Sequence, residues 1–482
     1  MNRFLIRAIA LIFLVLPAQG APLSGTKSVG PTGDYASLTS AIADIQAQTL
    51  GGPLVLELQS AYVSTVETFP LVFTNLTTTV TNTLTLRPQT GSTGLSISSA
   101  NTTKATLDLD GAQFVTIDGR PGGVGTVKHL TLANTSTSGV ALRFINEASS
   151  NTIRYLTLQG VNTSASSGTV VFSNTTGPNG NDNNTITFCD IGDGASTPAN
   201  GIYAAGTATT TTQNNSGNTI SSCNVFNFYR STAVDASGVK LTSGNTAWTL
   251  SGNSFYQTAS RAGVAATVRA IYLSNTSDNS HTVTGNFIGG TAPNAGGTAW
   301  TTTGTTQPYI FVGIWLRVGN SSATSVQGNT IRNFAWTSSS NAASQPGVWS
   351  GIHVETGTAN IGTINGNTIG NGTGTGSISV VTSGSGGKTF GIGSVSGATM
   401  AISNNIVGSL NAGGTTTGIA ASLTGIQVTQ GTNTISGNTI GSATTANSLF
   451  STTTVSTGAS QLVTGIEVAT GSTSTNTITG NT

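Results

Sequence analysis

A short motif recurs along most of the chain and limits its possible folds more than any other feature. The clearest copy is Asn433-Thr-Ile-Ser-Gly-Asn-Thr-Ile440, and the general pattern is apolar-x-x-(Asn, Cys or Leu)-x-apolar. We call the fourth residue of each hexad its marker. The markers are Leu130, Leu156, Cys189, Cys223, Asn253, Asn286, Asn329, Asn367, Asn405, Asn438 and Asn481. Repeats at such a period indicate stacked units, none of which can bury its apolar face alone.

The residues around the markers indicate strands. Ile435 and Ile440 are β-branched and alternate with Thr, Ser and Gly, which is the period of a strand and not of a helix. A second column, a small residue followed by apolar-x-apolar, precedes the markers; Gly313-Ile-Trp-Leu316 and Gly351-Ile-His-Val354 are examples. Length varies mainly between a marker and the next such column, as loop insertions on a constant frame would. The chain is therefore predicted to be all-β, a single-stranded parallel β-helix of about 11–12 coils.

These Gly-Ile-x-Val and Asn-x-Ile-x-Gly-Asn-x-Ile repeats resemble the right-handed parallel β-helix, or pectin-lyase-like, superfamily of secreted bacterial proteins. The resemblance covers roughly residues 30–482. It implies a right-handed solenoid. It leaves function open, because the superfamily includes lyases, hydrolases, esterases, adhesins and inert spacers.

The first 20 residues have the features of a secretory signal peptide. Arg3 and Arg7 precede the apolar run 8–16, and small residues follow up to Ala21. That run is too short to span a membrane, and no later segment qualifies. We therefore expect a secreted or cell-surface protein. With 6% charged residues, the mature chain offers no basic field for nucleic acid, and nothing in it calls for a cofactor.

Residues 21–110 are predicted to form an N-terminal cap and the first irregular coils, and residues 111–482 the regular repeats. The cap contains a helix at about 35–47, in which Leu38, Ala41, Ile42 and Ile45 share one face and Asp34 or Ser37 can cap the N-terminus. Such a helix would cover the apolar cross-section and open backbone of the first coil. The hexad at 114–119 lies only 15 residues before Leu130, so its register stays open.

The markers also predict internal contacts. Cys189 and Cys223 occupy the same position in consecutive coils and should stack ~4.8 Å apart. That distance permits a strained disulfide in an exported protein, or a buried pair of thiols. A metal site is not expected, because none of the three His shares a coil with either Cys. The later markers predict an asparagine ladder, with each Asn at a tight bend in left-handed geometry. Its members are Asn253, Asn286, Asn329, Asn367, Asn405, Asn438 and Asn481.

No catalytic residue is identified. Polysaccharide-cleaving relatives need clustered carboxylates or acidic calcium ligands. The pairs Asp108/Asp110 and Asp190/Asp193 are interpreted as solvent and turn residues. Gly119-Arg120-Pro121 resembles the Gly-Arg-Pro of methylesterases, but Gly replaces the Trp that follows it there, and we interpret it as a turn.

One candidate ligand site remains, on the outward positions of the second column. Tyr272, Trp315, Arg317, His353 and Glu355 are predicted to form one patch. Aromatic rings beside charged groups suit a polysaccharide; the alternative is cross-strand stacking with a surface ion pair worth at most ~1 kcal/mol.

The sequence thus favours a secreted or cell-surface scaffold or adhesin-like protein, with extracellular polysaccharide or a cell-surface component as candidate partner. The alternative is a carbohydrate-active enzyme, a polysaccharide lyase or glycoside hydrolase. The array stops at Asn481-Thr482, before the apolar position that closes the other hexads. We therefore expect either further coils beyond it or end-to-end self-association.

Overall fold

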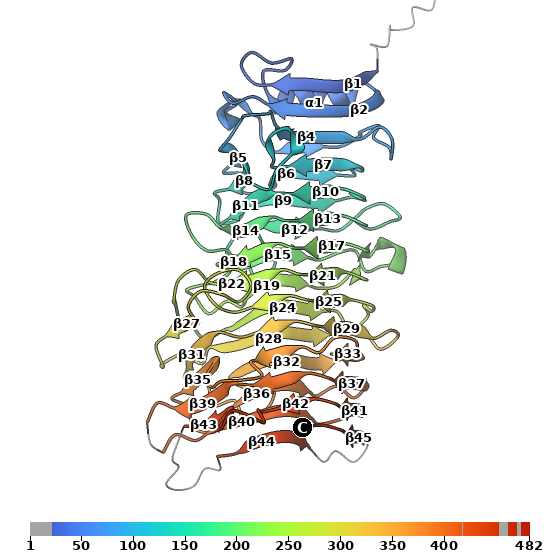
Figure 1. Ribbon diagram of the computed structural model, residues 1–482. Coiled ribbons are helices and arrows are strands. Elements are labelled where there is room, and N and C mark those ends of the chain that lie inside the picture. Colours follow the sequence, from blue (N-terminus) through green and yellow to red (C-terminus); the bar gives the residue numbers. More distant parts are fainter. Residues whose placement is uncertain (1–21, 417, 453–460, 470–473) are drawn as a thin grey trace, which may run out of the picture.

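The computed structural model describes residues 22–416, 418–452, 461–469 and 474–482. It is a stack of parallel strands wound into a solenoid (Figure 1). Every pair of named strands is parallel, and α1 (Leu38–Ala47) is the single α-helix of the described residues. The predicted all-β solenoid is confirmed. The predicted signal peptide at 1–20 lies outside the described residues.

Three long sheets run along the stack, and 11 successive coils pass through sheet A, then sheet C, then sheet B. Sheet A has 14 strands: β1 (Leu23–Val29), β2 (Leu50–Leu58), β4 (Leu84–Pro88), β7 (Val115–Asp118), β10 (Thr152–Arg154), β13 (Thr185–Thr187), β17 (Thr219–Ser221), β21 (Thr249–Ser251), β25 (Thr282–Thr284), β29 (Thr324–Gln327), β33 (Ala359–Ile361), β37 (Thr399–Ser403), β41 (Thr432–Ser436) and β45 (Thr475–Thr479).

Sheet C has 11 strands: β5 (Leu95–Ser99), β8 (Leu130–Asn134), β11 (Leu156–Gly160), β14 (Asp190–Asp193), β18 (Asn224–Phe226), β22 (Ser254–Tyr256), β26 (Phe287–Ile288), β30 (Thr330–Ile331), β34 (Thr368–Gly370), β38 (Ile406–Gly408) and β42 (Thr439–Ile440). These 11 strands mark 11 coils, in agreement with the expected number.

Sheet B has 12 strands: β3 (Leu71–Phe73), β6 (Ala105–Asp110), β9 (Val140–Ile145), β12 (Val170–Phe172), β15 (Asn200–Ala204), β19 (Ala236–Leu241), β24 (Thr267–Ser274), β28 (Ile310–Arg317), β32 (Trp349–Thr356), β36 (Gly387–Ser394), β40 (Ala421–Val428) and β44 (Val463–Val468). From β9 onward its strands include those of the Gly-Ile-x-Val column. Short 3-10 turns lie at Ser64–Val66, Pro121–Gly123 and Thr211–Gln213, and β16 (Asn215–Ser216) pairs with β20 (Asn245–Thr246).

A fourth sheet, sheet D, corrects the expectation of loop insertions. Between sheets C and B the later coils contain another parallel strand. Sheet D consists of β23 (Arg261–Ala262), β27 (Trp300–Thr303), β31 (Phe334–Ser338), β35 (Ile378–Thr382), β39 (Leu410–Gly414) and β43 (Leu449–Ser451). Trp300 and Phe334 turn inward from it and are buried, so the added length widens the core.

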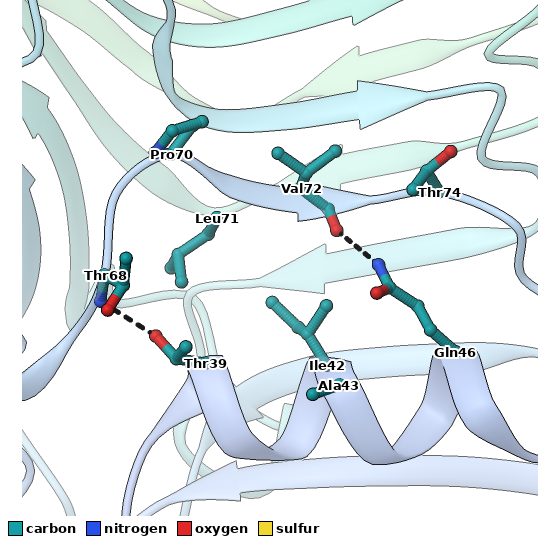
Figure 2. Close-up of a pocket in the computed structure, with 9 residues that line it drawn as sticks. All are labelled: Thr39, Ile42, Ala43, Gln46, Thr68, Pro70, Leu71, Val72 and Thr74. Atoms are coloured by element: carbon teal, nitrogen blue, oxygen red, sulfur yellow. Dashed lines mark hydrogen bonds between the residues drawn. The ribbon is translucent and has the colours of Figure 1, made fainter.

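The N-terminal helix is confirmed in type and orientation. Ser37 caps α1 by accepting a hydrogen bond from the N–H of Ser40, and the four predicted apolar residues are the buried ones. The helix packs beside β3, with a pocket of about 300 Å³ between them that is lined by residues such as Thr39, Ile42 and Leu71 (Figure 2). Asp34, the other candidate cap, accepts instead from Ser28.

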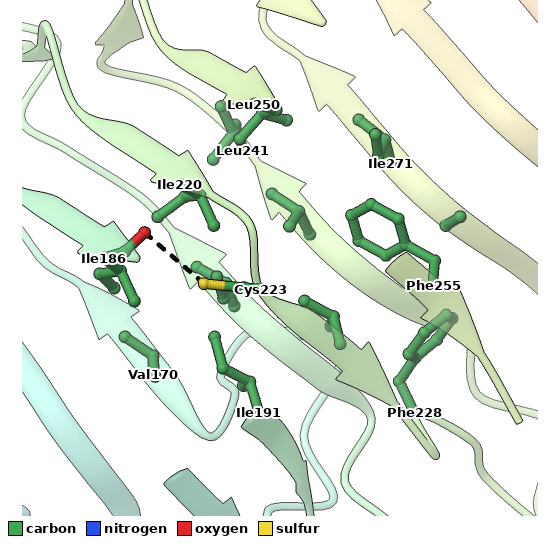
Figure 3. Packing of buried hydrophobic residues seen from close by; sticks show 14 of the residues in the cluster. Val170, Ile186, Ile191, Ile220, Cys223, Phe228, Leu241, Leu250, Phe255 and Ile271 are labelled. Carbon is green, nitrogen blue, oxygen red and sulfur yellow. Dashed lines mark hydrogen bonds between the residues drawn. The ribbon is translucent and has the colours of Figure 1, made fainter. Parts of the chain in front are cut away.

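The marker register is the one that the sequence predicted. Asp190 pairs with Asn224, which places Cys189 beside Cys223 on adjacent rungs. Inward aliphatic and aromatic residues fill the space between the sheets, and Cys223 lies among them (Figure 3). The hexad at 114–119, whose register the sequence left open, contains β7 of sheet A. Residues 119–129 separate it from β8 in the same coil.

The bend at the marker differs from the prediction in one residue. The left-handed conformation belongs to the residue before the marker, with φ of 53° at Tyr155, 54° at Phe188 and 63° at Gly252. The marker Asn residues themselves have no positive φ. In most of the later hexads a preceding Gly meets the backbone requirement, and before Asn405 it is met by Asn404 with φ of 60°, so the marker Asn is free to serve another purpose.

Candidate functional site

The predicted patch lies on the outer face of sheet B. Tyr272 of β24 pairs with Trp315 of β28, which pairs with His353 of β32. Their ring centroids are 5.4 Å and 5.1 Å apart, respectively. Trp315 therefore has a ring neighbour on each adjacent rung, tilted by 53° to the ring of Tyr272 and by 74° to the ring of His353.

A cation that the sequence reasoning missed completes this stack. The guanidinium of Arg269 lies 4.5 Å from the ring centroids of both Tyr272 and Trp315. Its Nη1 donates to Asp235 at 2.9 Å, and the Arg269 side chain is 8% exposed. No signal in the sequence predicted this contact, since strand alternation places residues three apart, such as Arg269 and Tyr272, on opposite faces.

His353 does not contribute as predicted, because it is buried. It is 1% exposed, and its Nδ1 lies 3.2 Å from Oε1 of Gln345. Gln345 in turn donates to Oε1 of Gln427 at 2.7 Å, which ties its loop to sheet B. Burial lowers the pKa of His353 to about 4, so the imidazole is neutral at pH 7 and is covered by this loop.

Arg317 and Glu355 are the accessible charges of the patch, with side chains 40% and 34% exposed. A register shift after Leu316 pairs Arg317 with Thr356, so the expected alignment of Arg317 with Glu355 is wrong by one residue. The ion pair nevertheless forms, with Arg317 Nε 3.2 Å from Oε1 of Glu355. Trp315 donates its Nε1–H to Oε2 of the same carboxylate at 2.9 Å. A hydrogen bond to Tyr272 raises the pKa of Arg317.

The asparagine markers form a ladder, a buried file of side chains in which each amide is hydrogen-bonded to the next. Asn253 donates its backbone N–H and its Nδ2–H to Oδ1 of Asn286, both at 3.0 Å, and Nδ2 also donates to the carbonyl of Ile220 at 2.9 Å. The same bonds recur at each step down to Asn481. Each amide is thereby satisfied inside the stack, which is a structural role.

The two cysteines continue this file upward as free, buried thiols. The N–H of Cys189 points to Sγ of Cys223 at 3.4 Å, and the N–H of Cys223 donates to Oδ1 of Asn253 at 3.0 Å. Burial, with the neighbouring Cys223, raises the pKa of the Cys189 thiol. Of the two forms that the sequence left open, the structure contains the thiol pair.

Two of the four aspartates interpreted as turn and solvent residues, Asp108 and Asp190, are engaged in ion pairs. Asp108 is 2% exposed and receives two hydrogen bonds from Arg143, at 2.7 and 2.8 Å, so the solvent interpretation is wrong for it. Asp190 is bound by Lys128 at 2.5 Å. Across the described ranges, no group of three or more His, Cys, Asp or Glu side chains is placed to hold a metal ion. No helix in the described part of the chain has the length and apolarity that a membrane crossing requires.

Comparisons with protein families, curated proteins and solved structures found no match to this chain.

Proposed function

We propose that the protein is a secreted or cell-surface scaffold of adhesin type, whose sheet B contacts extracellular polysaccharide. The observation that carries the proposal is the continuous parallel pairing of strands in three sheets through 11 coils. A one-dimensional array whose neighbouring units pair along every strand is stiff and presents side chains at a regular spacing, which suits a surface rod. The pectin-lyase-like superfamily remains the proposed relationship, on the repeat pattern alone.

Polysaccharide contact is proposed at Arg317, Glu355 and the hydroxyl of Tyr272. The two charges are about a third exposed and lie side by side, so they can exchange hydrogen bonds with sugar hydroxyls. The rings beneath them act as a rigid base. Stacking of a sugar on the face of Trp315 is not part of the proposal, because the guanidinium of Arg269 lies 4.5 Å from its ring centroid and the rings of both neighbouring rungs lie within 5.4 Å.

The enzyme alternative receives less support from these contacts. Asp108, Asp190 and Glu355 each bind a cation within 3.2 Å. A glycosidase needs one carboxyl group with a raised pKa facing a second one across the sugar. A reducing-sugar assay on pectic and algal polysaccharides tests this alternative directly, and release of product by the parent chain would favour it.

The scaffold proposal is tested by export and by retention. We expect the full chain, expressed in a bacterial host, to leave the cytoplasm and lose residues 1–20, and the chain without them to stay inside. On immobilised polysaccharide, Arg317→Ala should reduce retention. Lys388→Ala is the matched control, because Lys388 forms a similar ion pair with Glu467 elsewhere on sheet B. Cytoplasmic location of the full chain contradicts the proposal, and equal retention of both variants removes the patch from it.

A further inference from the structure

Four side chains are stacked one on the next at the corner between sheets A and C. We call this stack the pile; it consists of Asp118, Arg120, Tyr155 and Phe188. Tyr155 and Phe188 occupy the positions just before two successive markers, and their rings stack with centroids 4.9 Å apart and planes 12° from parallel. The guanidinium of Arg120 lies 4.3 Å from the Tyr155 centroid. Because Phe188 covers one face of Tyr155, the guanidinium must cover the other.

The base of the pile is held by a buried carboxylate. Asp118 is fully buried and receives hydrogen bonds from Nε and Nη2 of Arg120, at 2.9 and 2.7 Å, and from Nε of Arg154 at 2.8 Å. The bonds from Arg120 and the charge of Arg154 outweigh desolvation and lower the pKa of Asp118. The turn containing Gly119-Arg120-Pro121 therefore fixes Arg120 beneath the rings.

The top of the pile is an open aromatic face. Phe188 is 43% exposed, although most large apolar residues of the chain are buried. The residue in register on the next rung is Ser222, which has no ring to place against it. One face of Phe188 is thus stacked on Tyr155 and the other is available, which distinguishes it from Trp315.

The rungs beyond Ser222 leave a shelf beside this face. Gly252 and Gly285 occupy the same corner position, and a methyl group built on either would meet no atom closer than 3.8 Å. The shelf closes at Gly328, where Nδ2 of Asn365 lies 2.5 Å from such a methyl group. At ~4.8 Å per rung, the shelf extends ~14 Å from Phe188, enough for a few linked sugar rings.

Hydrogen-bonding groups flank the open face on both sheets. Thr187 and Ser221 lie on sheet A, with their hydroxyls 2.9 Å apart. Asp190 and Asn224 lie on sheet C, where the amide of Asn224 donates to Oδ1 of Asp190 at 2.7 Å. Lys128 neutralises Asp190, so the groups nearest the open face carry little net charge.

We propose that the open face of Phe188, with the shelf over Ser222, Gly252 and Gly285, binds a neutral, β-linked polysaccharide by stacking one sugar ring. A pyranose with equatorial hydroxyls presents a face of C–H groups, which carry partial positive charge and suit the negative face of an aromatic ring. Its hydroxyls point sideways, toward the polar groups of the two sheets. The site is distinct from the sheet B patch and shares with the proposed function only the class of ligand.

The test uses calorimetric titration of the purified chain with cellohexaose and, separately, with hexagalacturonate. Phe188→Arg removes the ring and places a guanidinium over Tyr155. Ser222→Arg keeps the ring and covers its open face, as Arg120 covers Tyr155. Each should weaken cellohexaose binding about tenfold or more, which corresponds to about 1.4 kcal/mol. Phe450→Arg is the matched control, since Phe450 is 41% exposed on sheet D and gains the same charge.

The outcomes separate this inference from the proposed function. Parent-level affinity in both Phe188→Arg and Ser222→Arg, tighter binding of hexagalacturonate, or no binding of cellohexaose by the parent overturns the site. If Arg317→Ala abolishes binding while Phe188→Arg does not, the sheet B patch stands and the Phe188 site falls. The scaffold proposal itself depends on export and is judged separately. Unchanged thermal transitions of the variants show that lost binding is not lost folding.

Discussion

The upper, N-terminal coils of the solenoid and the lower coils from Asn253 onward place their buried asparagine amides at different corners. In the upper coils a file of asparagines lies where sheet B leads into sheet A: Asn151 donates to Oδ1 of Asn184 at 2.9 Å, and Asn184 to Asn218 at 3.0 Å. At the other corner the same coils have Leu156, Cys189 and Cys223. From Asn253 onward the file lies where sheet A leads into sheet C.

The residues at which each file of asparagines ends explain why the file changes corner between the two regions. Each amide of a file is satisfied only if the next rung offers an oxygen at the same place. The upper file ends at Trp248, whose N–H donates to Nδ1 of His281 at 3.2 Å. A parallel file through Asn245 ends at Asp278, whose buried Oδ1 has no hydrogen-bond partner. An amide file is therefore a property of consecutive rungs, and changing the residue type on one rung ends it.

The two regions also differ in cross-section. The upper coils are closed by three sheets and filled mainly by aliphatic residues with a pair of stacked phenylalanines, Phe144 and Phe172. In the lower coils sheet D widens the interior. The added space holds a cluster of aromatic rings: Trp300, Tyr309, Phe311, Phe334, Trp336 and Trp349. A wider coil needs larger side chains, since protein interiors are close-packed.

The largest effect is expected from Trp300→Ala. Trp300 is 1% exposed and contacts Phe228, Phe311 and Phe334, with centroids 5.3–5.7 Å apart. Its loss leaves a cavity that the sheets cannot close, which should lower the free energy of unfolding by about 3–5 kcal/mol. Chemical denaturation measures the change in the free energy of unfolding. Phe172→Ala is the three-sheet comparison, and a smaller loss for Trp300→Ala than for Phe172→Ala would contradict this account of sheet D.

The next effect concerns the file itself. Asn329→Leu places at a lower corner the residue type that fills it in the upper coils. Asn329 donates to Asn367 at 2.8 Å and to the carbonyl of Val283 at 2.9 Å, and its Oδ1 accepts two bonds from Asn286. Leucine leaves these buried donors and acceptors without hydrogen-bond partners, which should lower the free energy of unfolding by about 3 kcal/mol in total.

Hydrogen exchange at the amides of the neighbouring rungs locates this loss. The N–H of Asn286 should exchange faster in Asn329→Leu than in the parent. Asn365→Leu, an exposed amide two residues before the next marker, should leave both exchange and stability unchanged. If both variants behave alike, the file contributes nothing to stability.

A pH-dependent effect follows from the end of the upper file. Burial lowers the pKa of His281 to about 4. An unfolded histidine titrates near 6.5, so the unfolded chain takes up the proton first. Stability should fall as the pH drops from about 6.5 to about 4, by up to about 3 kcal/mol for this group. Asp278 opposes the trend, because burial raises its pKa to about 7 and its stabilising contribution is lost as the pH rises from about 4 to 7.

His281→Asn isolates the contribution of the histidine. It restores the residue type of the upper file and offers Oδ1 as an acceptor for the N–H of Trp248 in place of Nδ1 of His281. Unfolding experiments at pH 7 and pH 4.5 should show a smaller loss in the variant than in the parent, while the effect of Asp278 stays in both. An equal loss would mean that His281 does not titrate in this range.

The regular part of this structure followed from the sequence because one pattern repeats. The markers gave the register from Leu130 to Asn481, and the spacing of Leu38, Ala41, Ile42 and Ile45 gave the face of α1. These inferences rest on burial and period, which a sequence displays directly.

The remainder depended on contacts between distant residues. The sequence indicated a loop insertion around Trp300, because its parallel partner at Phe334 lies 34 residues away in a stretch without a motif. His353 was expected outside because strand alternation places it there, and only the loop around Gln345 buries it. The exposed Phe188 was overlooked because its importance comes from Arg120, which reaches it from an earlier coil through Tyr155.

The smallest effect is expected from Cys223→Asn, which extends the lower file by one rung. An amide at this position finds its partners in place: Oδ1 of Asn253 below, the carbonyl of Ile186, and the N–H of Cys189 above. We expect a change in the free energy of unfolding within about 1 kcal/mol, since no buried group loses a partner. Cys189→Asn makes the opposite prediction, because the atom below it is the sulfur of Cys223, a weak acceptor. It should cost more than Cys223→Asn, and the double variant should recover part of that cost. Equal losses for the two single variants would show that an amide file does not depend on the rung beneath it, and that the change of corner between the two regions has another cause.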